Sequence, residues 1–448
     1  MNISPLDDRY RDEVEELIPF FSEMGLMKYR IQVEVEYLVA LGKEKGIPQL
    51  PPFSAGRQKD LRLLYQSFSA RDFQSIKKIE EETHHDVKAV EYFLRRKLNR
   101  LDMEEYEEWV HFALTSEDVN NLAYALMWQE AITEVYLPIL SGLIGELKHF
   151  AESYRDTPIL ALTHGQPATP TSLGKEYAVY VQRLARQLRQ MKGHKLQGKL
   201  SGATGTWGAH VASFPEIDWI NFSKKFISSF GMEPNLVTTQ IEANDALAES
   251  YQILSRINTV LLDLCRDVWL YMSRGIFNQR QHSGEVGSST MPHKVNPIQF
   301  ENAEGNLGLA NVYLSHLANA LPVSRLQRDL SGSTIIRNQG VPLAHALLAC
   351  KNIRKGLKRL FINEQNLRRE LNEHWEVLAE AVQTVLRKTG DKKAYERLKE
   401  MIRKERVTQS DMHAMLEQLN LPETEKQMLL ALSPETYIGL ASKIVGEG

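Results

Sequence analysis

Cysteine is scarce in this 448-residue sequence, which holds only Cys265 and Cys350. They lie far apart, each within an apolar helical pattern, so we predict two buried thiols in a reducing compartment rather than a disulfide. Long uncharged runs are missing too, because the longest apolar-rich stretch, residues 135–145, is too short to span a bilayer and contains Pro138. The first residues lack the basic and then apolar pattern of a signal peptide. We therefore expect a soluble cytoplasmic protein without a membrane partner.

The sequence also lacks an excess of one charge and the common cofactor motifs. Lys and Arg number 54 against 57 Asp and Glu, a net charge of −3, so no global basic field points to nucleic acid. Neither a Walker loop nor a dinucleotide glycine fingerprint is present, and the spaced Gly202, Gly205 and Gly208 are weak evidence alone. No His or Cys pair has metal-site spacing, and the adjacent His84 and His85 on a helix would point about 100° apart. The sequence therefore predicts no metal site.

Alternating strand patterns are absent as well, so the predicted fold is nearly all-α. The strongest helical stripe lies in residues 245–272, where apolar residues recur at spacings of three and four, as in a coiled-coil seam. Its members are Leu254, Ile257, Leu261, Leu264, Val268 and Tyr271. This helix and those predicted at 173–191 and 302–321 exceed the average length of about 11–12 residues, which favours a bundle. The seams carry more apolar surface than one chain's bundle needs, so we predict a homo-oligomer.

Composition divides the chain into three predicted domains. Residues 1–104 form an N-terminal helical domain, residues 105–355 the long-helix bundle with a reactive loop, and residues 356–448 a smaller domain of short charged helices. A hydroxyl N-cap followed three residues later by an acid predicts a helix start at Thr115. Pro138 is expected to kink the long helix that follows.

One stretch, residues 287–297, is poorly suited to a helix interior. Its sequence, Gly-Ser-Ser-Thr-Met-Pro-His-Lys-Val-Asn-Pro, contains two prolines, a glycine and three hydroxyl residues, all of which favour loops or turns. Its backbone N–H groups, its hydroxyls and the charge of Lys294 suit an anion, or a negative charge that develops during a reaction. We interpret the stretch as a reactive loop held by a helical scaffold.

This loop resembles the signature loop of the fumarase/aspartase superfamily, whose members eliminate fumarate or run the reverse addition. The variant with His293, together with residues 163–170 (Thr-His-Gly-Gln-Pro-Ala-Thr-Pro), is similar to the adenylosuccinate lyase family within it. The resemblance runs nearly end to end, from residues 4–10 to the C-terminal helices. It implies an all-α, three-domain chain with a central long-helix bundle, assembled as a homotetramer whose active sites are shared between subunits. It also implies β-elimination of fumarate, without a cofactor, from adenylosuccinate and from succinylaminoimidazole carboxamide ribotide in purine biosynthesis.

The catalytic residues follow partly from chemistry and partly from the resemblance. From the residues alone, Ser288 and Ser289 both stay open as the base, because a loop hydroxyl usually bonds its own backbone. His164 sits in a predicted turn, and an elimination that expels nitrogen near neutral pH needs an acid to protonate the leaving group. The resemblance implies that His164 is this acid and Ser288 the base, with Ser289 in support. Lys294, with amide donors such as Asn296, would stabilise the aci-carboxylate dianion.

Substrate binding is implied by the resemblance at a larger set of residues. His84, His85 and Asp86 match a substrate-binding tripeptide in which His85 lies near the reacting centre and Asn usually stands in place of His84. The other matching positions are Arg9, Tyr10, Thr115, Ser116, Gln240, Lys294, Asn302, Arg328, Ser333, Thr334, Ile335, Ile336 and Arg337. Arginines suit bidentate contacts to phosphate and carboxylate, and a hydroxyl pair at a helix N-terminus is a good anion site. The roles of His282 and His293 stay open.

Two alternatives remain at this point. The first is a related lyase with another leaving group, such as argininosuccinate lyase, aspartase or fumarase. Fumarases and aspartases usually carry Gly where this chain has His293, and their equivalent of the His164 turn lacks the Gly-Gln-Pro sequence. The second alternative is a non-catalytic helical scaffold, which the presence of His164, Ser288 and Lys294 disfavours.

Overall fold

A computed structural model describes residues 3–280, 291, 295–401 and 407–447. The chain divides into two compact units, each assembled from three stretches. The first comprises Met1–Leu140, Gln187–Thr259 and Gly305–Ala349, and the second comprises Ser141–Arg186, Val260–Glu304 and Cys350–Gly448. The three sequential domains stay a prediction, since these units group residues by contact rather than by order along the chain.

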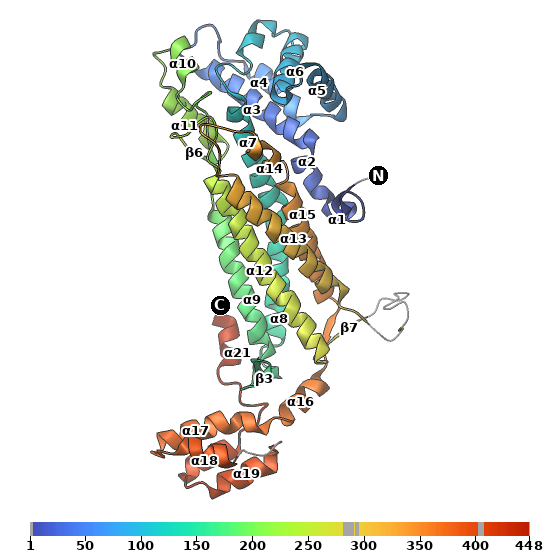
Figure 1. Ribbon diagram of the computed structural model, residues 1–448, viewed down its shortest axis with the longest axis vertical. Coiled ribbons are helices and arrows are strands. Elements are labelled where there is room, and N and C mark those ends of the chain that lie inside the picture. The colour runs from blue at the N-terminus through green and yellow to red at the C-terminus, as the bar shows by residue number, and fades with distance from the viewer. Residues whose placement is uncertain (1–2, 281–290, 292–294, 402–406, 448) are drawn as a thin grey trace. The chain divides into compact units, whose positions relative to one another are not determined.

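The N-terminal part of the first unit is built around α3 (Glu23–Lys43), which packs against α4 (Ala55–Gln66), α6 (Asp86–Arg100) and α7 (Ser116–Glu130) (Figure 1). The Ser22 hydroxyl caps α3 by accepting the Gly25 N–H at 3.0 Å. The residues of α3 are buried on more than one face, so this helix runs through the core of its unit rather than over the surface. The other elements here are η1 (Pro5–Asp7), α1 (Arg11–Val14), η2 (Glu15–Leu17), α2 (Ile18–Phe21), α5 (Ala70–Thr83) and η3 (Glu104–Trp109).

The rest of the first unit brings loop segments to the start of α7. Lys199 and Asp118 form a fully buried ion pair at 2.8 Å, and the same Asp118 oxygen accepts the Ser201 N–H at 2.9 Å. A buried charge pair of this kind needs such added hydrogen bonds to offset its desolvation, and it fixes the 199–202 segment against α7. The elements concerned are β5 (Gln197–Gly198), parallel to β6 (Glu233–Pro234), with α10 (Gly208–Ser213), α11 (Trp219–Ser229) and α14 (Ser331–Ile336).

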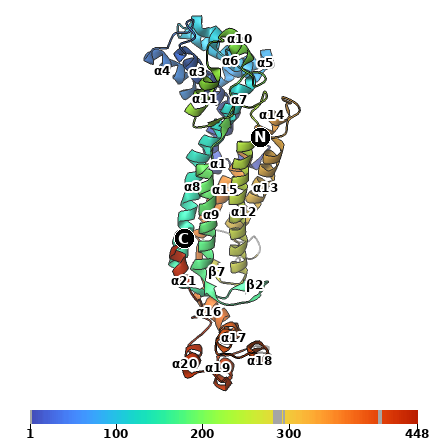
Figure 2. The same cartoon turned by 90° about the vertical axis from the view of Figure 1, so that its left-hand side faces the viewer.

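The long helices run through both units, and within each unit their segments lie side by side (Figures 1 and 2). They are α8 (Leu137–Ser153), α9 (Leu173–Gly193), α12 (Asp245–Ser273), α13 (Ile298–Ala320) and α15 (Gly340–Leu357). Every member of the seam predicted on α12 from Leu254 to Val268 is at most 1% exposed. The all-α prediction and the predicted bundle are therefore confirmed. A π-helical turn, η4 (Ala131–Tyr136), ends two residues before Pro138, whose ring removes one N–H from the helical ladder.

The second unit adds short hairpins and a C-terminal group of helices. Its strands are β1 (Pro158–Ile159) with β4 (Thr171–Ser172), β2 (Leu162–Thr163) with β3 (Gln166–Pro167), and β7 (Phe277–Gln279) with β8 (Leu360–Ile362), all antiparallel. Helices α16 (Glu364–Asn372), η5 (Trp375–Leu378), α17 (Ala379–Lys388), α18 (Ala394–Met401), α19 (Gln409–Gln418), α20 (Glu423–Leu430), α21 (Ala441–Ile444) and η6 (Val445–Glu447) follow. Residues between Trp375 and Leu429 form a separate hydrophobic core.

Two predictions about absences can be compared with the described part of the chain. Cys265 and Cys350 are both buried thiols outside any disulfide, as predicted. Among the described residues, no helix combines the length and the apolar character that crossing a membrane requires.

Candidate active site

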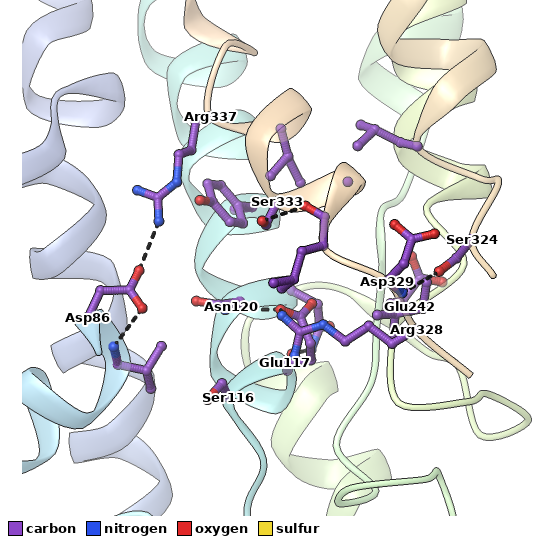
Figure 3. A pocket seen from close by; sticks show the side chains of 18 of the residues that line it. Asp86, Ser116, Glu117, Asn120, Glu242, Ser324, Arg328, Asp329, Ser333 and Arg337 are labelled. Carbon is purple, nitrogen blue, oxygen red and sulfur yellow. Dashed lines mark hydrogen bonds and ion pairs between the residues drawn. The ribbon is translucent and has the colours of Figure 1, made fainter. Parts of the chain in front are cut away.

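A cavity of about 430 Å³ opens within the first unit, where the starts of α6 and α7 face the segment around α14. Its lining is rich in charge and hydrogen-bonding groups, and it includes three arginines, Arg30, Arg328 and Arg337. In Figure 3, Arg337 and Asp86 point toward each other, while Arg328 reaches from the other side toward Glu117. The cavity is therefore lined for a polar ligand rather than an apolar one, and its arginines are side chains that can pair with anionic groups.

The start of α6 is shaped by a sharp turn between two helices. His84 ends α5 in the left-handed conformation, with φ 53°, and its N–H donates to the Glu80 carbonyl at 2.8 Å. His85 is extended and caps α6, since its Nδ1 accepts the Lys88 N–H at 3.1 Å. Because Nδ1 is the acceptor, the neutral ring of His85 carries its proton on Nε2 and can donate it. Asp86 follows as the first helical residue, where the helix dipole favours a carboxylate.

The start of α7 contributes a second helix end to the same cavity. Thr115 is extended, and its N–H donates to Asp118 Oδ2 at 2.9 Å, so the helix start predicted from the capping pattern is confirmed. Ser116, the first helical residue, lines the cavity. Helices α6 and α7 have 15 residues each, and residues at the start of both helices line the cavity. Two positive helix ends at one cavity favour a bound anion.

A continuous chain of charged and amide groups runs along the cavity wall. Arg337 Nη2 and Arg30 Nη2 each lie 2.8 Å from the same oxygen of Asp86. Arg30 Nε then donates to Asn120 Oδ1 at 2.9 Å, and Asn120 Nδ2 donates to Glu117 Oε1 at 3.0 Å. Because each member holds the next, the wall is preorganised.

The far end of this chain is Arg328. Its Nη2 lies 2.9 Å from Glu117 Oε1, and its Nη1 donates to Gln240 Oε1 at 2.9 Å. The contacts with Glu117 and Gln240 therefore fix the orientation of the Arg328 guanidinium. Arg328 and Arg337 thus close the chain at both ends, each oriented by a carboxylate that a substrate anion could replace.

Asp86 is the electrostatic centre of the wall. Burial alone would raise the pKa of its carboxyl group, but the charges and hydrogen bonds of Arg30 and Arg337 outweigh burial and lower the pKa to about 2. Asp86 is therefore ionised throughout the physiological pH range. It neutralises part of the positive charge of the two arginines and holds their side chains in place.

The opposite wall is held by its own contacts. The side-chain and backbone hydrogen bonds from Ser331 lower the pKa of Asp329 to about 2, and the Asp329 N–H donates to Ser324 Oγ at 3.0 Å. Glu242 is 4% exposed, and burial raises the pKa of its carboxyl group although Asn235 and Asn244 donate to it. This wall thus combines a fixed anion with a carboxyl group that burial pushes toward its neutral form.

His164 lies at the tip of a two-residue hairpin in the second unit. Strands β2 and β3 are joined by His164 and Gly165, whose φ values are 55° and 73°. Two positive φ values are the requirement of a type I′ turn, and Gly165 meets it without strain. The turn predicted for His164 is therefore confirmed. Its side chain is exposed, and among the described residues none pairs with its imidazole.

Eight of the sixteen predicted substrate-binding residues line the cavity. Those that line it are His84, His85, Asp86, Ser116, Arg328, Ser333, Ile336 and Arg337. Gln240 adjoins it through Arg328, while Thr115, Thr334 and Ile335 belong to the same helix starts without lining it. Arg9 and Tyr10 lie in the same unit outside the lining, with the Arg9 guanidinium 5.7 Å from the centre of the Tyr10 ring.

The remaining predicted residues lie elsewhere. Asn302 is on α13 in the second unit, where its Oδ1 accepts Asn352 Nδ2 at 2.9 Å. His282, Ser288, Ser289, His293 and Lys294 lie outside the described residues, so their predicted roles stay predictions. Asn296 is described and lines a separate cavity of the second unit. In the part of the chain that is described, no group of three or more His, Cys, Asp or Glu side chains could hold a metal ion.

Sequence reasoning missed three members of the wall: Arg30, Glu117 and Asn120. Arg30 is 1% exposed and lies in a helix whose neighbouring residues are apolar on more than one face. That context was the available signal, because a charge inside an all-round apolar helix must find a buried partner. Glu117 and Asn120 lie in the first turns of a helix already identified, but nothing in the sequence distinguishes them from ordinary surface residues.

Comparison with known proteins gives a consistent result over the whole chain. A family model described as lyase matches residues 8–313, and one described as adenylosuccinate lyase C-terminal matches residues 324–438. The chain is 48% identical over 444 residues to adenylosuccinate lyase from Haemophilus influenzae, covering 99% of this chain and 97% of that protein. It is 49% identical over 446 residues to the enzyme of the same name from Escherichia coli, covering 99% and 98%.

More distant solved structures share the fold. A 3-carboxy-cis,cis-muconate lactonizing enzyme from Pseudomonas putida superposes with a TM-score of 0.75 at 20% identity, over 98% of this chain and 97% of that one. A fumarate lyase from Mesorhizobium sp. BNC1 gives a TM-score of 0.74 at 19% identity, over 97% of each chain. At such low identity these matches support the architecture alone.

Proposed function

The chain belongs to the adenylosuccinate lyase family, and from that premise we propose how its residues carry out the reaction. It is a lyase that eliminates fumarate from adenylosuccinate to leave AMP, and from succinylaminoimidazole carboxamide ribotide to leave the carboxamide ribotide. This family membership removes the alternatives of another leaving group and of a non-catalytic scaffold. A cytoplasmic location is part of the proposal.

The proposed chemistry needs two proton transfers and one broken C–N bond. The deprotonated hydroxyl of Ser288 takes a proton from the succinyl β-carbon, and the electron pair left on carbon delocalises into the adjacent carboxylate. Lys294 stabilises the dianion that results. That electron pair then forms the C=C bond of fumarate as the C–N bond breaks. The nitrogen keeps the electrons of the broken bond and receives a proton from His164.

The observation that carries the proposal is the cavity of the first unit. The substrate has a phosphate and two carboxylates, and the cavity offers two arginines and two helix N-termini for such groups. We assign it to substrate binding, with Arg328 and Arg337 as the anion-binding side chains. His85 Nε2 is the free donor at the α6 end and would hydrogen-bond the succinyl group near the reacting carbon.

A homotetramer with shared active sites is the second part of the proposal. On α13 the apolar side chains of Leu309, Val312 and Tyr313 are 52%, 70% and 41% exposed, and they follow helical spacing along one face. An apolar stripe on a long helix is the kind of surface that a second copy of the chain covers. His164, at an exposed hairpin tip, would then reach a site completed by another subunit.

The test begins with the wild-type protein. Loss of adenylosuccinate absorbance should be matched by release of fumarate, and His164→Ala should lower kcat by about 10²–10⁴-fold, the range for removal of a general acid. Ser288→Ala should abolish turnover. Wild-type protein that binds adenylosuccinate without releasing fumarate would overturn the proposed function.

Complementation tests the shared site separately. If His164 and Ser288 of one site come from different subunits, mixing the two inactive variants in equal amounts should restore about a quarter of wild-type activity after subunit exchange. Exchange can be followed with differently labelled chains. Labelled subunits that exchange while activity stays at the level of the separate variants would refute sharing.

A further inference from the structure

Arg30 is a buried cation that is linked to Arg328 and Arg337, the proposed anion-binding residues, only through other side chains. Its side chain is 1% exposed and projects from α3 to the floor of the cavity. Three of its nitrogens are used: Nη2 with Asp86 at 2.8 Å, Nε with Asn120 Oδ1 at 2.9 Å, and Nη1 with Met27 Sδ at 3.7 Å. Because it is so fully enclosed, the residue has little surface left for a substrate.

The two polar partners of Arg30 belong to two different helices. Asp86 is the first residue of α6, and Asn120 is in the first turns of α7. One rigid guanidinium therefore joins the two helix starts that line the cavity. Hydrogen bonds and ion pairs also connect Arg30 to both proposed anion-binding arginines. The connection to Arg337 runs through Asp86, and the connection to Arg328 runs through Asn120 and Glu117.

The choice of arginine has a physical reason. Burying a cation is costly, so its retention calls for compensation by a carboxylate and a full set of hydrogen bonds. A guanidinium presents donors in a fixed planar fork, whereas the single ammonium of lysine cannot hold Asp86 and Asn120 in the same fixed geometry. The charge of Arg30 lies beside the positive ends of α6 and α7. Without the negative charges of Asp86 and Glu117, this third positive group would raise the energy of the folded site.

We propose that Arg30 is a positioning residue that fixes the spacing of the α6 and α7 N-termini and thereby the orientation of Arg337 and Arg328 toward the substrate. This inference rests on the proposed function of the cavity and deepens it. It assigns to Arg30 an effect on binding rather than on proton transfer, because Arg30 acts only through groups that bind.

The decisive measurement separates KM from kcat. Arg30→Lys and Arg30→Met should each raise the KM for adenylosuccinate, and the dissociation constant of the product AMP, by about ten-fold or more, while kcat changes by less than about three-fold. Arg30→Lys keeps the charge and loses the fork, so it should lose less thermal stability than Arg30→Met while its KM still rises. It therefore keeps the test valid if Arg30→Met does not fold.

Two controls make the result specific. Arg62, on α4, pairs with Glu36 of α3, the helix that carries Arg30, through contacts of 2.7 and 2.9 Å, and it lies outside the cavity lining. The KM of the Arg62→Met variant should equal that of wild type. Asn120→Ala alone should raise KM, yet add little when combined with Arg30→Lys, since both cut the same connection.

The outcomes separate the two proposals. An active wild type, with folded Arg30→Lys and Arg30→Met variants whose KM values are unchanged, would overturn the role of Arg30 and leave the function intact. A fall in kcat alone would contradict it as well, because it would place Arg30 in the chemical step. An inactive wild type would instead count against the proposed function.

Discussion

Replacing Asp86 with asparagine isolates the charge that the cavity wall depends on. Asparagine has nearly the shape of a protonated aspartic acid, so Asp86→Asn imitates the neutral carboxyl group. The two arginines lower the pKa of Asp86 from its ordinary 3.8 to about 2. At about 1.4 kcal/mol per pH unit, this difference makes the ionised form worth about 2 kcal/mol of folding free energy at pH 7. The variant should lose that amount.

The same reasoning fixes how the loss changes with pH. The folded-state pKa lies below the unfolded one, so the stabilisation is fully present above pH 3.8 and disappears as the pH falls through about 2. At pH 3 the wild type should keep only about 1 kcal/mol of it, and at pH 2 less than about half a kcal/mol. The gap between wild type and Asp86→Asn should therefore narrow by about 1 kcal/mol between pH 7 and pH 3.

Equilibrium urea unfolding, followed by circular dichroism at one fixed protein concentration, measures this gap. Asp60→Asn is a suitable control, because Asp60 is exposed on α4 and makes no polar contact among the described residues. It should change stability by less than about 0.5 kcal/mol at either pH. A gap for Asp86→Asn that is the same at pH 7 and pH 3 would refute the assignment, since its origin would then be packing rather than charge.

Further predictions concern binding, pH and backbone. Arg328→Met should raise the KM for adenylosuccinate by about ten-fold or more in steady-state assays, because it removes a doubly held anion-binding group. Burial lowers the pKa of His210 from 6.5 to about 4, so stability should fall as the pH drops below 6.5; at pH 5 the loss is about 2 kcal/mol relative to pH 7.5, and His210→Gln should lack this part of the pH dependence in urea unfolding. Gly205→Ala should cost at least about 2 kcal/mol in thermal unfolding, because φ is +76° and the new Cβ would lie 2.3 Å from the Thr238 carbonyl oxygen. Gly208→Ala is its control, since the nearest atom there is 3.6 Å away, and an equal loss in both variants would exclude the steric explanation.

Features with a local or periodic cause could be predicted from the sequence. The α12 seam is buried from Leu254 to Val268, where its three-and-four spacing indicated, because a stripe on a helix has only one face to bury. The start of α7 could be predicted because the capping pattern lies within four residues, Thr115 to Asp118. The turn at His164 could be predicted because Gly165 and the prolines after it favour turns.

The contacts across the cavity could not be predicted in the same way. Arg30 and Asp86 are 56 residues apart, and Asp86 and Arg337 are 251 apart, so their pairing depends on how several helices pack. The resemblance identified Asp86 and Arg337 separately but gave no reason to join them. The apolar helix around Arg30 indicates that its charge is buried, but its partners Asp86 and Asn120, 56 and 90 residues away, could not be identified from the sequence.

The two parts of the proposed machinery are held by different means, and this difference has a measurable consequence. Asp86 and Arg30 take part in the packing of the first unit, so a substitution there should lower stability and binding together. His164 is exposed at a hairpin tip where its left-handed backbone, not its ring, is what the turn requires. His164→Asn keeps a residue that tolerates this conformation and should leave the unfolding free energy within about 0.5 kcal/mol of wild type while turnover is lost. Such a separation of activity from stability is expected only of a residue whose partner is the substrate.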